Sequence, residues 1–246
     1  MNDRVLTALP VYNEVAYVNE VLDEVSRFAP CVLVVDDGSG DGTSDLLAAR
    51  GDVQIVTHPE NQGYGAALIS AFQYATVHGY EFLVTIDCDG QHEPQLIPKF
   101  VEVCRSADIV SGSRYLRPFE DGNNPPPVER KRINQIMTAE INERLSFGIT
   151  DAFCGFKAYR VASLKKLQLT EPGYAIPLEL WVQASAAKLH VVELPVPLIY
   201  LDEKRNFGGG LDEADVRLEY YRLVLNRSIV ALSRCKKEAL AERPGR

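Results

Sequence analysis

The sequence is poor in cysteine and has no long apolar segment. Its five cysteines among 246 residues lie far apart and form no C-x-x-C pair. This excludes a cysteine-based zinc motif and a disulfide framework, and it is typical of a reducing compartment. No window approaches the roughly 18 uninterrupted apolar residues of a membrane span, and the first residues show no signal-peptide core. We therefore expect a cytoplasmic protein without a transmembrane segment.

Positive charge is also scarce. The chain has 26 Lys and Arg residues against 34 Asp and Glu, so its net charge is −8 at pH 7. An acidic surface repels polyanions, and we expect no nucleic-acid partner. Two short basic runs, at residues 129–132 and 234–237, are typical of solvated helix faces.

Apolar and amphipathic segments alternate through the first half of the chain. The predicted strands are residues 4–9, 31–37, 53–58, 82–87 and 108–113, and the predicted helices between them are residues 14–28, 43–50, 66–78 and 95–104. The strand at 31–37 is continuously apolar before its acidic end, as in a strand buried on both faces. The alternation predicts an α/β fold with a mostly parallel central sheet flanked by helices.

The second half is less regular. Residues 117–127 are rich in Pro, Gly and Asn and predict a loop, residues 151–160 are interpreted as irregular, and further helices are expected at residues 128–147, 177–188 and 212–234. Two prolines within residues 190–201 favour an edge strand, which we expect to be antiparallel. There are no internal repeats and no clear linker, so the prediction is one domain over residues 1–246 with a C-terminal helix.

Polar groups collect where the predicted strands end. The four segments are PVYNE, DDGSGDGT, HPENQGYGAA and DCDGQHEP, and three of them carry carboxylates close to the strand. Ligands of open α/β sheets bind at the carboxyl ends of the strands. The cluster therefore indicates a ligand site.

Asp87, Asp89 and Gln91 form a D-x-D-x-Q set after one of these strands. In an extended segment these three side chains point to the same side. Oxygen ligands of this kind suit Mg²⁺ or Mn²⁺, which would also relieve the repulsion between the carboxylates. The alternative is an Asp-rich turn without a ligand.

Asp36 and Asp37 end another predicted strand and precede a Gly-rich turn. Several acidic groups would repel a phosphate, so a nucleoside is the better guest, with Asp accepting from a base N–H or a ribose hydroxyl. His58 and His92 lie near these loops and are interpreted as structural rather than as bases.

Six ordered motifs (LPVYNE, VVDDGSGDGT, NQGYGAA, DCDGQHEP, SGSRY and DAFCGFKAYR) resemble those of family 2 glycosyltransferases with the GT-A fold. Within that family the chain is most similar to the dolichyl- or polyprenyl-phosphate mannose or glucose synthases. The resemblance implies one Rossmann-like GT-A domain. Its expected parts are a nucleotide and metal half at 4–116, an acceptor half at 117–211, and a C-terminal helix and tail at 212–246.

The resemblance also implies roles for individual residues. The residues implied to contact the nucleotide-sugar are Pro10, Tyr12, Glu14, Val35, Asp37, Asp87, Cys88, Asp89 and Arg114. Asp87, Asp89 and Gln91 are implied to hold the metal, and Arg114 and Arg205 to contact the diphosphate or the acceptor phosphate. A guanidinium suits this task because it pairs with two phosphate oxygens.

The implied reaction is inverting, metal-dependent transfer of mannose or glucose from a GDP- or UDP-sugar. The expected acceptor is a polyprenyl or dolichyl phosphate, which is ionised near pH 7 and needs no base. A hydroxyl acceptor would need one, and Asp151 is then the candidate, with a helix-capping Asp as the alternative reading. The chain departs from the synthases at residues 208–211, which read GGGL where a Ser-Lys pair is usual.

Other functions fit less well. DCDG resembles the nucleophile loop of haloacid dehalogenase phosphohydrolases, but three predicted strands precede it. A sugar nucleotidyltransferase should carry a Gly-rich basic loop after the first strand, and a non-catalytic binding module should lack Asp87 or Asp89. The apolar residues of the last helix, 220–235, favour core packing, with shallow contact at the cytoplasmic face of a membrane or a homodimer interface as alternatives.

Overall fold

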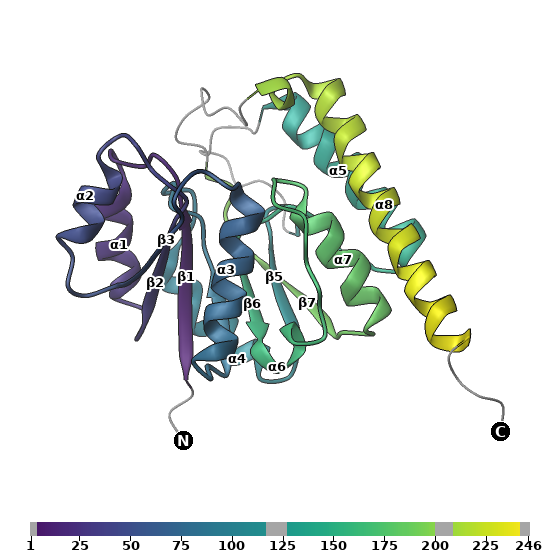
Figure 1. Cartoon of the computed structure of the whole chain (residues 1–246), viewed down its shortest axis with the longest axis horizontal. Helices are drawn as coiled ribbons and strands as arrows, with labels where there is room; N and C mark the ends of the chain where they lie inside the picture. Colours follow the sequence, from purple (N-terminus) through teal and green to yellow (C-terminus); the bar gives the residue numbers. More distant parts are fainter. Residues whose placement is uncertain (1–3, 117–126, 200–208, 242–246) are drawn as a thin grey trace.

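A computed structural model describes residues 4–116, 127–199 and 209–241, with the side chains of the last helix described to residue 234. Its centre is a seven-stranded sheet with the order β3-β2-β1-β4-β6-β5-β7 (Figure 1). The strands are β1 Val5–Val11, β2 Val32–Asp36, β3 Gln54–Thr57, β4 Phe82–Thr85, β5 Ile109–Ser113, β6 Lys157–Arg160 and β7 Val191–Pro195. The predicted α/β class with a mostly parallel sheet is confirmed.

The one antiparallel strand lies inside the sheet and not at its edge as expected. β6 runs antiparallel to both β4 and β5, whereas the edge strand β7 runs parallel to β5. β6 also falls within the segment predicted to be irregular. The segment KAYR contains two basic residues and so does not look like a buried strand, yet Lys157 is almost fully buried. Its ammonium donates to the backbone carbonyl of Cys154, which satisfies one of its donors inside the protein.

Helices cover both faces of the sheet. They are α1 Val18–Ser26, α2 Thr43–Ala48, α3 Tyr64–Val77, α4 Ile97–Cys104, α5 Val128–Leu145, α6 Val161–Leu164, α7 Ile176–Ala186 and α8 Ala214–Ala241, with short 3₁₀ turns η1 Pro94–Leu96 and η2 Gly209–Asp212. All seven predicted helices are present with shifted ends, and α6 is an additional short helix. Within the described ranges no helix is long and apolar enough to cross a membrane.

Three apolar clusters hold these layers together. One joins α1 and α4 to the first face of the sheet around Leu22 and Phe100, and a second joins α3 and α6 to the other face around Phe72 and Leu164. The third lies around the fully buried Trp181 and joins α5, α7 and α8. Figure 1 shows α8 as the outermost helix, beside α5 and α7. Both faces of the sheet are therefore covered, and the ends of the strands remain for a site.

Candidate active site

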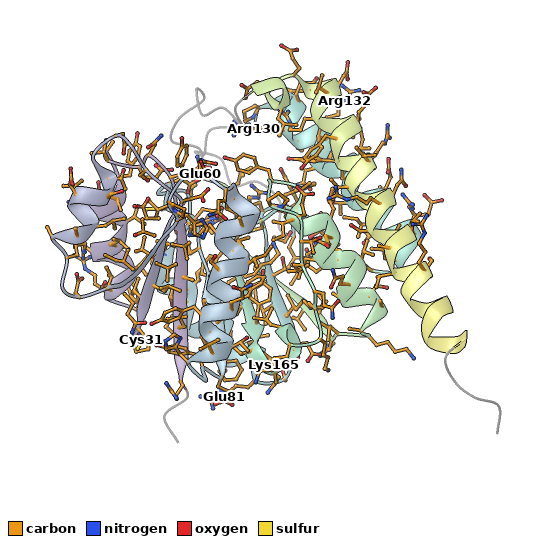
Figure 2. The ribbon with its side chains drawn as sticks, viewed as in Figure 1. Cys31, Glu60, Glu81, Arg130, Arg132 and Lys165 are labelled. Carbon is orange, nitrogen blue, oxygen red and sulfur yellow. The ribbon has the colours of Figure 1, made fainter. Side chains whose placement is uncertain are left out.

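A cavity of about 760 Å³ opens at the carboxyl ends of β1, β2 and β4. Glu60, which follows β3, marks this end of the molecule in Figure 2, and Glu81, which precedes β4, marks the other. The predicted site residues that line the cavity are Pro10, Tyr12, Glu14, Asp37, Asp87, Cys88, Asp89, Gln91 and Arg114. The expectation that a ligand binds at the carboxyl ends of the strands therefore predicted the position of the cavity correctly.

Three predicted residues are not among those lining the cavity. Val35 is fully buried and packs in the cluster between the sheet and α3. Asp151 is also fully buried, beside Arg114. Arg205 lies outside the described residues.

Asp87 is held from two sides. The Tyr64 hydroxyl donates to its Oδ1 at 2.8 Å, and His92 Nε2 lies 3.3 Å from its Oδ2. A side chain at Gly155 would collide with this carboxylate, because a Cβ there would lie 2.0 Å from Oδ2. Burial raises the pKa of Asp87, but the hydrogen bond and charge of His92, the hydrogen bond of Tyr64 and the charge of Lys157 bring it below its ordinary value. Asp87 therefore stays ionised.

The pKa of Asp89 shifts in the opposite direction, above its ordinary value. Burial raises its pKa, and the charge of Asp87 raises it further. Its Oδ1 accepts a hydrogen bond from the backbone N–H of Gln91 at 3.0 Å. The pair therefore carries negative charge that a cation would neutralise.

The residues present fit a divalent cation that is also bound to a phosphate. Two carboxylates and the Gln91 amide line one cavity. Among the described residues no three His, Cys, Asp or Glu side chains gather as a complete metal site. Mg²⁺ is usually held by one or two carboxylates, with water and substrate phosphates completing its shell. Asp87 and Asp89 suit this mode of binding.

The wall behind Asp87 depends on two glycines in NQGYGAA. A Cβ at Gly63 would lie 2.4 Å from the carbonyl oxygen of Pro172, and one at Gly65 would lie 2.2 Å from that of Glu171. Residues 171–174 therefore rest directly on the start of α3, where Ala66 N–H donates to Pro172 O at 3.0 Å. The glycines permit a close approach of two backbone segments.

Tyr174, at the end of that loop, stacks on Tyr64 with the ring centres 5.6 Å apart. Tyr64 in turn donates to Asp87. A loop far away in the sequence thus supports the acidic pair.

Asp37 lines the cavity, but its carboxylate is engaged with the protein. His58 Nδ1 lies 2.6 Å from Oδ1, and the N–H groups of Gln62 and Gly63 donate at 2.9 and 2.8 Å. The other nitrogen of His58 meets Ser70 Oγ at 2.8 Å. Because a carboxylate only accepts, Nδ1 carries the proton in the first of these bonds. In this structure Asp37 fixes the loop before α3, and contact with a nucleoside stays a prediction.

Arg114 and Asp151 form a bidentate ion pair. Nε and Nη2 of Arg114 donate to Asp151 at 2.7 and 3.0 Å. Asp151 also accepts from Asn134 Nδ2 at 2.7 Å and from Phe153 N–H at 3.1 Å. Burial raises the pKa of Asp151, but the charge and hydrogen bonds of Arg114 lower it well below its usual range. A carboxylate with a lowered pKa is a weak proton acceptor. The role of Asp151 as a base, which was expected only for a hydroxyl acceptor, stays a prediction.

The family model described as "Glycosyl transferase family 2" matches residues 7–168. The chain belongs to glycosyl transferase family 2. It is a glycosyltransferase, and the family resemblance of its motifs is confirmed.

Two curated relatives extend the similarity over most of this glycosyltransferase. The undecaprenyl-phosphate mannosyltransferase of Micrococcus luteus is 32% identical over 231 residues, which cover 89% of this chain and 94% of that protein. The polyprenol monophosphomannose synthase of Mycolicibacterium smegmatis is 34% identical over 206 residues, which cover 78% and 76%. These names match the branch that the motifs indicated.

A solved structure supports the fold. Glucosyl-3-phosphoglycerate synthase from Mycobacterium tuberculosis, in complex with Mn²⁺, UDP and glucosyl-3-phosphoglycerate, superposes with a TM-score of 0.70 at 18% identity. The match covers 93% of this chain and 80% of that one.

The far wall of the transferase cavity contains two arginines that the sequence reading missed. Arg130 comes from the first turn of α5 (Figure 2) and Arg217 from α8. Arg217 is buried and donates to the carbonyl of Leu211 at 2.6 Å. Burial and the nearby charge of Arg130 both lower its pKa. Arg130 belongs to the basic run at 129–132, which was read as a solvated face, and only the fold brings it to the cavity.

Proposed function

We propose that this glycosyltransferase moves mannose or glucose from a GDP- or UDP-sugar to a polyprenyl or dolichyl phosphate, with Mg²⁺ or Mn²⁺ bound. The observation that carries the proposal is that one cavity contains both a pair of carboxylates and several arginines. Asp87 and Asp89 lie in its wall, and so do Arg114, Arg130 and Arg217. Such a cavity suits a metal-bound diphosphate together with a second phosphate. The names of the two curated relatives support transfer of mannose to a polyprenyl phosphate.

On the donor side, Asp87, Asp89 and Gln91 would hold the cation. When bound, the cation supplies electrostatic stabilisation of the departing diphosphate. Tyr64 and His92 fix the Asp87 carboxylate so that it needs little reorganisation when the donor binds. The nucleoside would contact Pro10, Tyr12 and Glu14, which line this cavity together with Cys88.

On the acceptor side, Arg114 and Arg130 would pair with the acceptor phosphate. Asp151 holds the Arg114 guanidinium in one orientation through two hydrogen bonds. The same wall carries Phe153 and Tyr221, whose rings stack 4.9 Å apart and offer an apolar surface to a prenyl chain. Arg205 is proposed to contact one of the two phosphates.

A phosphate acceptor also agrees with the state of Asp151. An ionised phosphate attacks the anomeric carbon without losing a proton, so no base is required. A hydroxyl acceptor would require one, and Asp151 is fully buried with both oxygens engaged. We therefore favour the lipid phosphate over the hydroxyl alternative. Peripheral contact at the cytoplasmic face of a membrane, and the division into halves at 4–116 and 117–211, stay predictions.

The experiment is a transfer assay with labelled donors. The full chain is incubated with Mn²⁺, a polyprenyl phosphate and each of GDP-mannose, UDP-mannose, GDP-glucose and UDP-glucose, and the label entering the organic phase is counted. One donor is expected to transfer, and chelation by EDTA should stop the reaction. Transfer to free saccharide but never to the lipid phosphate would contradict the proposed acceptor. Undiminished transfer in EDTA would contradict the metal.

A further inference from the structure

The outer face of α8 carries a row of exposed aliphatic side chains. Val216, Leu223 and Val230 are 48%, 62% and 49% exposed, and each follows the previous one by seven residues. Seven residues are nearly two helical turns, so the three side chains form one stripe. The opposite side of the helix, including Val224 and Leu225, is fully buried against α5 and α7. The stripe is therefore about half exposed and lies outside the apolar cluster that packs α8 against α5 and α7.

Charge changes sign along the same exposed surface. Asp215 and Glu219 lie before Leu223 and are exposed, whereas Arg227 and Arg234 lie after it and are also exposed. Arg222, next to Leu223, is also exposed but pairs with Glu140 of α5 at 2.7 Å. Along the stripe itself, one end therefore carries acidic neighbours and the other basic ones. A second copy of the same surface, turned end over end, would meet it with opposite charges.

We propose that two copies of this chain associate through α8, with the helices antiparallel and a two-fold axis at Leu223. Leu223 then meets its counterpart, Val216 of each copy faces Val230 of the other, and Glu219 faces Arg227 of the other. Each of these pairs is symmetric about Leu223, as an isologous interface requires. One helix surface thus provides both apolar contact and two charge pairs.

Arg227 forms an ion pair within its own chain and can still pair with Glu219 of the second copy. Its guanidinium donates to the buried carboxylate of Glu171, yet its side chain is 57% exposed. A guanidinium has five N–H donors, so it serves Glu171 and the second copy together. A parallel pair of helices would place Glu219 against Glu219 and is disfavoured. The acidic half of the stripe also makes an anionic lipid surface a poor occupant.

Analytical ultracentrifugation of the full chain tests the association. The native chain should sediment as a dimer. Leu223→Arg places two like charges on the axis and removes two buried leucines, so the dissociation constant should rise by about a hundredfold or more. Val77→Arg, at a 79% exposed position on α3, is the matched control and should stay dimeric. A monomeric native chain, or an unchanged dimer in Leu223→Arg, would overturn the proposal.

Cross-linking tests the direction of the helices in a Cys31→Ser, Cys235→Ser background. Mixing Val216→Cys with Val230→Cys should give disulfides between the two variants, and Leu223→Cys should link to itself. Val216→Cys alone should not, since antiparallel helices separate the two sulfur positions by about 21 Å. Self-linking of Val216→Cys, or Leu223-dependent binding of a monomer to phosphatidylglycerol vesicles, would overturn the arrangement. The stripe lies on the side of α8 away from the cavity, so either result leaves the transferase proposal standing.

Discussion

Arg114 and Asp151 meet through two hydrogen bonds of 2.7 and 3.0 Å, which the Nε and Nη2 edge of the guanidinium donates to the two carboxylate oxygens. Asp151 is wholly buried, while the Arg114 side chain keeps about a fifth of its surface exposed. The buried carboxylate thus holds the guanidinium of Arg114 in the cavity wall. Glu193 of β7 in turn holds the backbone at Asp151 in place. Its carboxylate accepts from the backbone N–H of Asp151 at 3.1 Å and from that of Thr150 at 2.8 Å.

Replacing Asp151 by Asn should weaken both the fold and catalysis. The variant leaves the Arg114 cation partly buried without its counter-charge, and breaking a buried ion pair costs about 3–5 kcal/mol. Urea unfolding should show a loss of about 3 kcal/mol, and the KM for the lipid phosphate should rise. Glu24→Gln removes an exposed pair with Arg27 and should cost under about 1 kcal/mol. Equal losses in the two variants would contradict the anchoring role.

The same ion pair predicts how stability depends on pH. The pKa of Asp151 is lowered in the folded protein, so its contribution is present above the unfolded pKa of about 3.9 and is lost as the pH falls toward the folded value. The stability difference between the native chain and Asp151→Asn should therefore be full at pH 6 and smaller at pH 3. Urea unfolding at several pH values measures it. A difference that grows on acidification would reverse the assigned sign.

Sequence patterns predicted the layered fold because its signals are local. Continuous apolar runs such as residues 31–37 are strands buried on both faces, and acidic residues at their ends indicated the cavity. Strand β6 was not predicted, because its own sequence is misleading. Lys157 makes the strand read as polar, and its burial depends on a carbonyl and on the Trp181 ring, whose centre lies 5.7 Å from the ammonium.

The missed parts of the site depend on contacts between distant segments. Arg217 reaches the cavity only because α8 packs on α7 and α5, and no local pattern reports that. The glycines of NQGYGAA are needed because the backbone of residues 171–172 approaches them closely, and no local pattern reports that contact. The bonds from His58, Gln62 and Gly63 to the Asp37 carboxylate likewise join distant segments, and contact of Asp37 with a nucleoside stays a prediction.

Asp89→Asn should abolish transfer and leave the fold intact. Burial and the charge of Asp87 make the ionised Asp89 unfavourable without a cation, so its neutral analogue should be slightly more stable. A gain near 1 kcal/mol corresponds to a rise of about 2–4 °C in Tm for a chain of this size. Thermal unfolding with and without Mn²⁺ is the measurement, and the native chain should respond to the metal far more than the variant. Full metal-dependent turnover in Asp89→Asn would show that the cation binds elsewhere.

Gly65→Ala should displace the loop at residues 171–174. The added Cβ would lie 2.2 Å from Glu171 O, so the loop must move and take Tyr174 from its stack on Tyr64. We expect a loss of about 1–3 kcal/mol in urea unfolding, together with a lower kcat because Tyr64 supports Asp87. Gly51→Ala has open space around it and is the matched control. Native stability in Gly65→Ala would show that the loop does not depend on this contact.

Arg130→Ala and Arg132→Ala compare an arginine that lines the cavity with a surface arginine in the same turn of α5. Figure 2 shows both residues at the start of α5, yet only Arg130 lines the cavity, whereas Arg132 is exposed and pairs with Glu129 at 3.0 Å. Loss of an arginine that contacts an ionised phosphate removes about 1.5–3 kcal/mol, which is roughly ten- to a hundredfold in affinity. Arg130→Ala should raise the KM for the polyprenyl phosphate by that factor with little change in the KM for the donor. Arg132→Ala should match the native enzyme in both. If Arg130→Ala instead raised only the donor KM, this arginine would belong to the diphosphate, and the two phosphate sites would have to be exchanged.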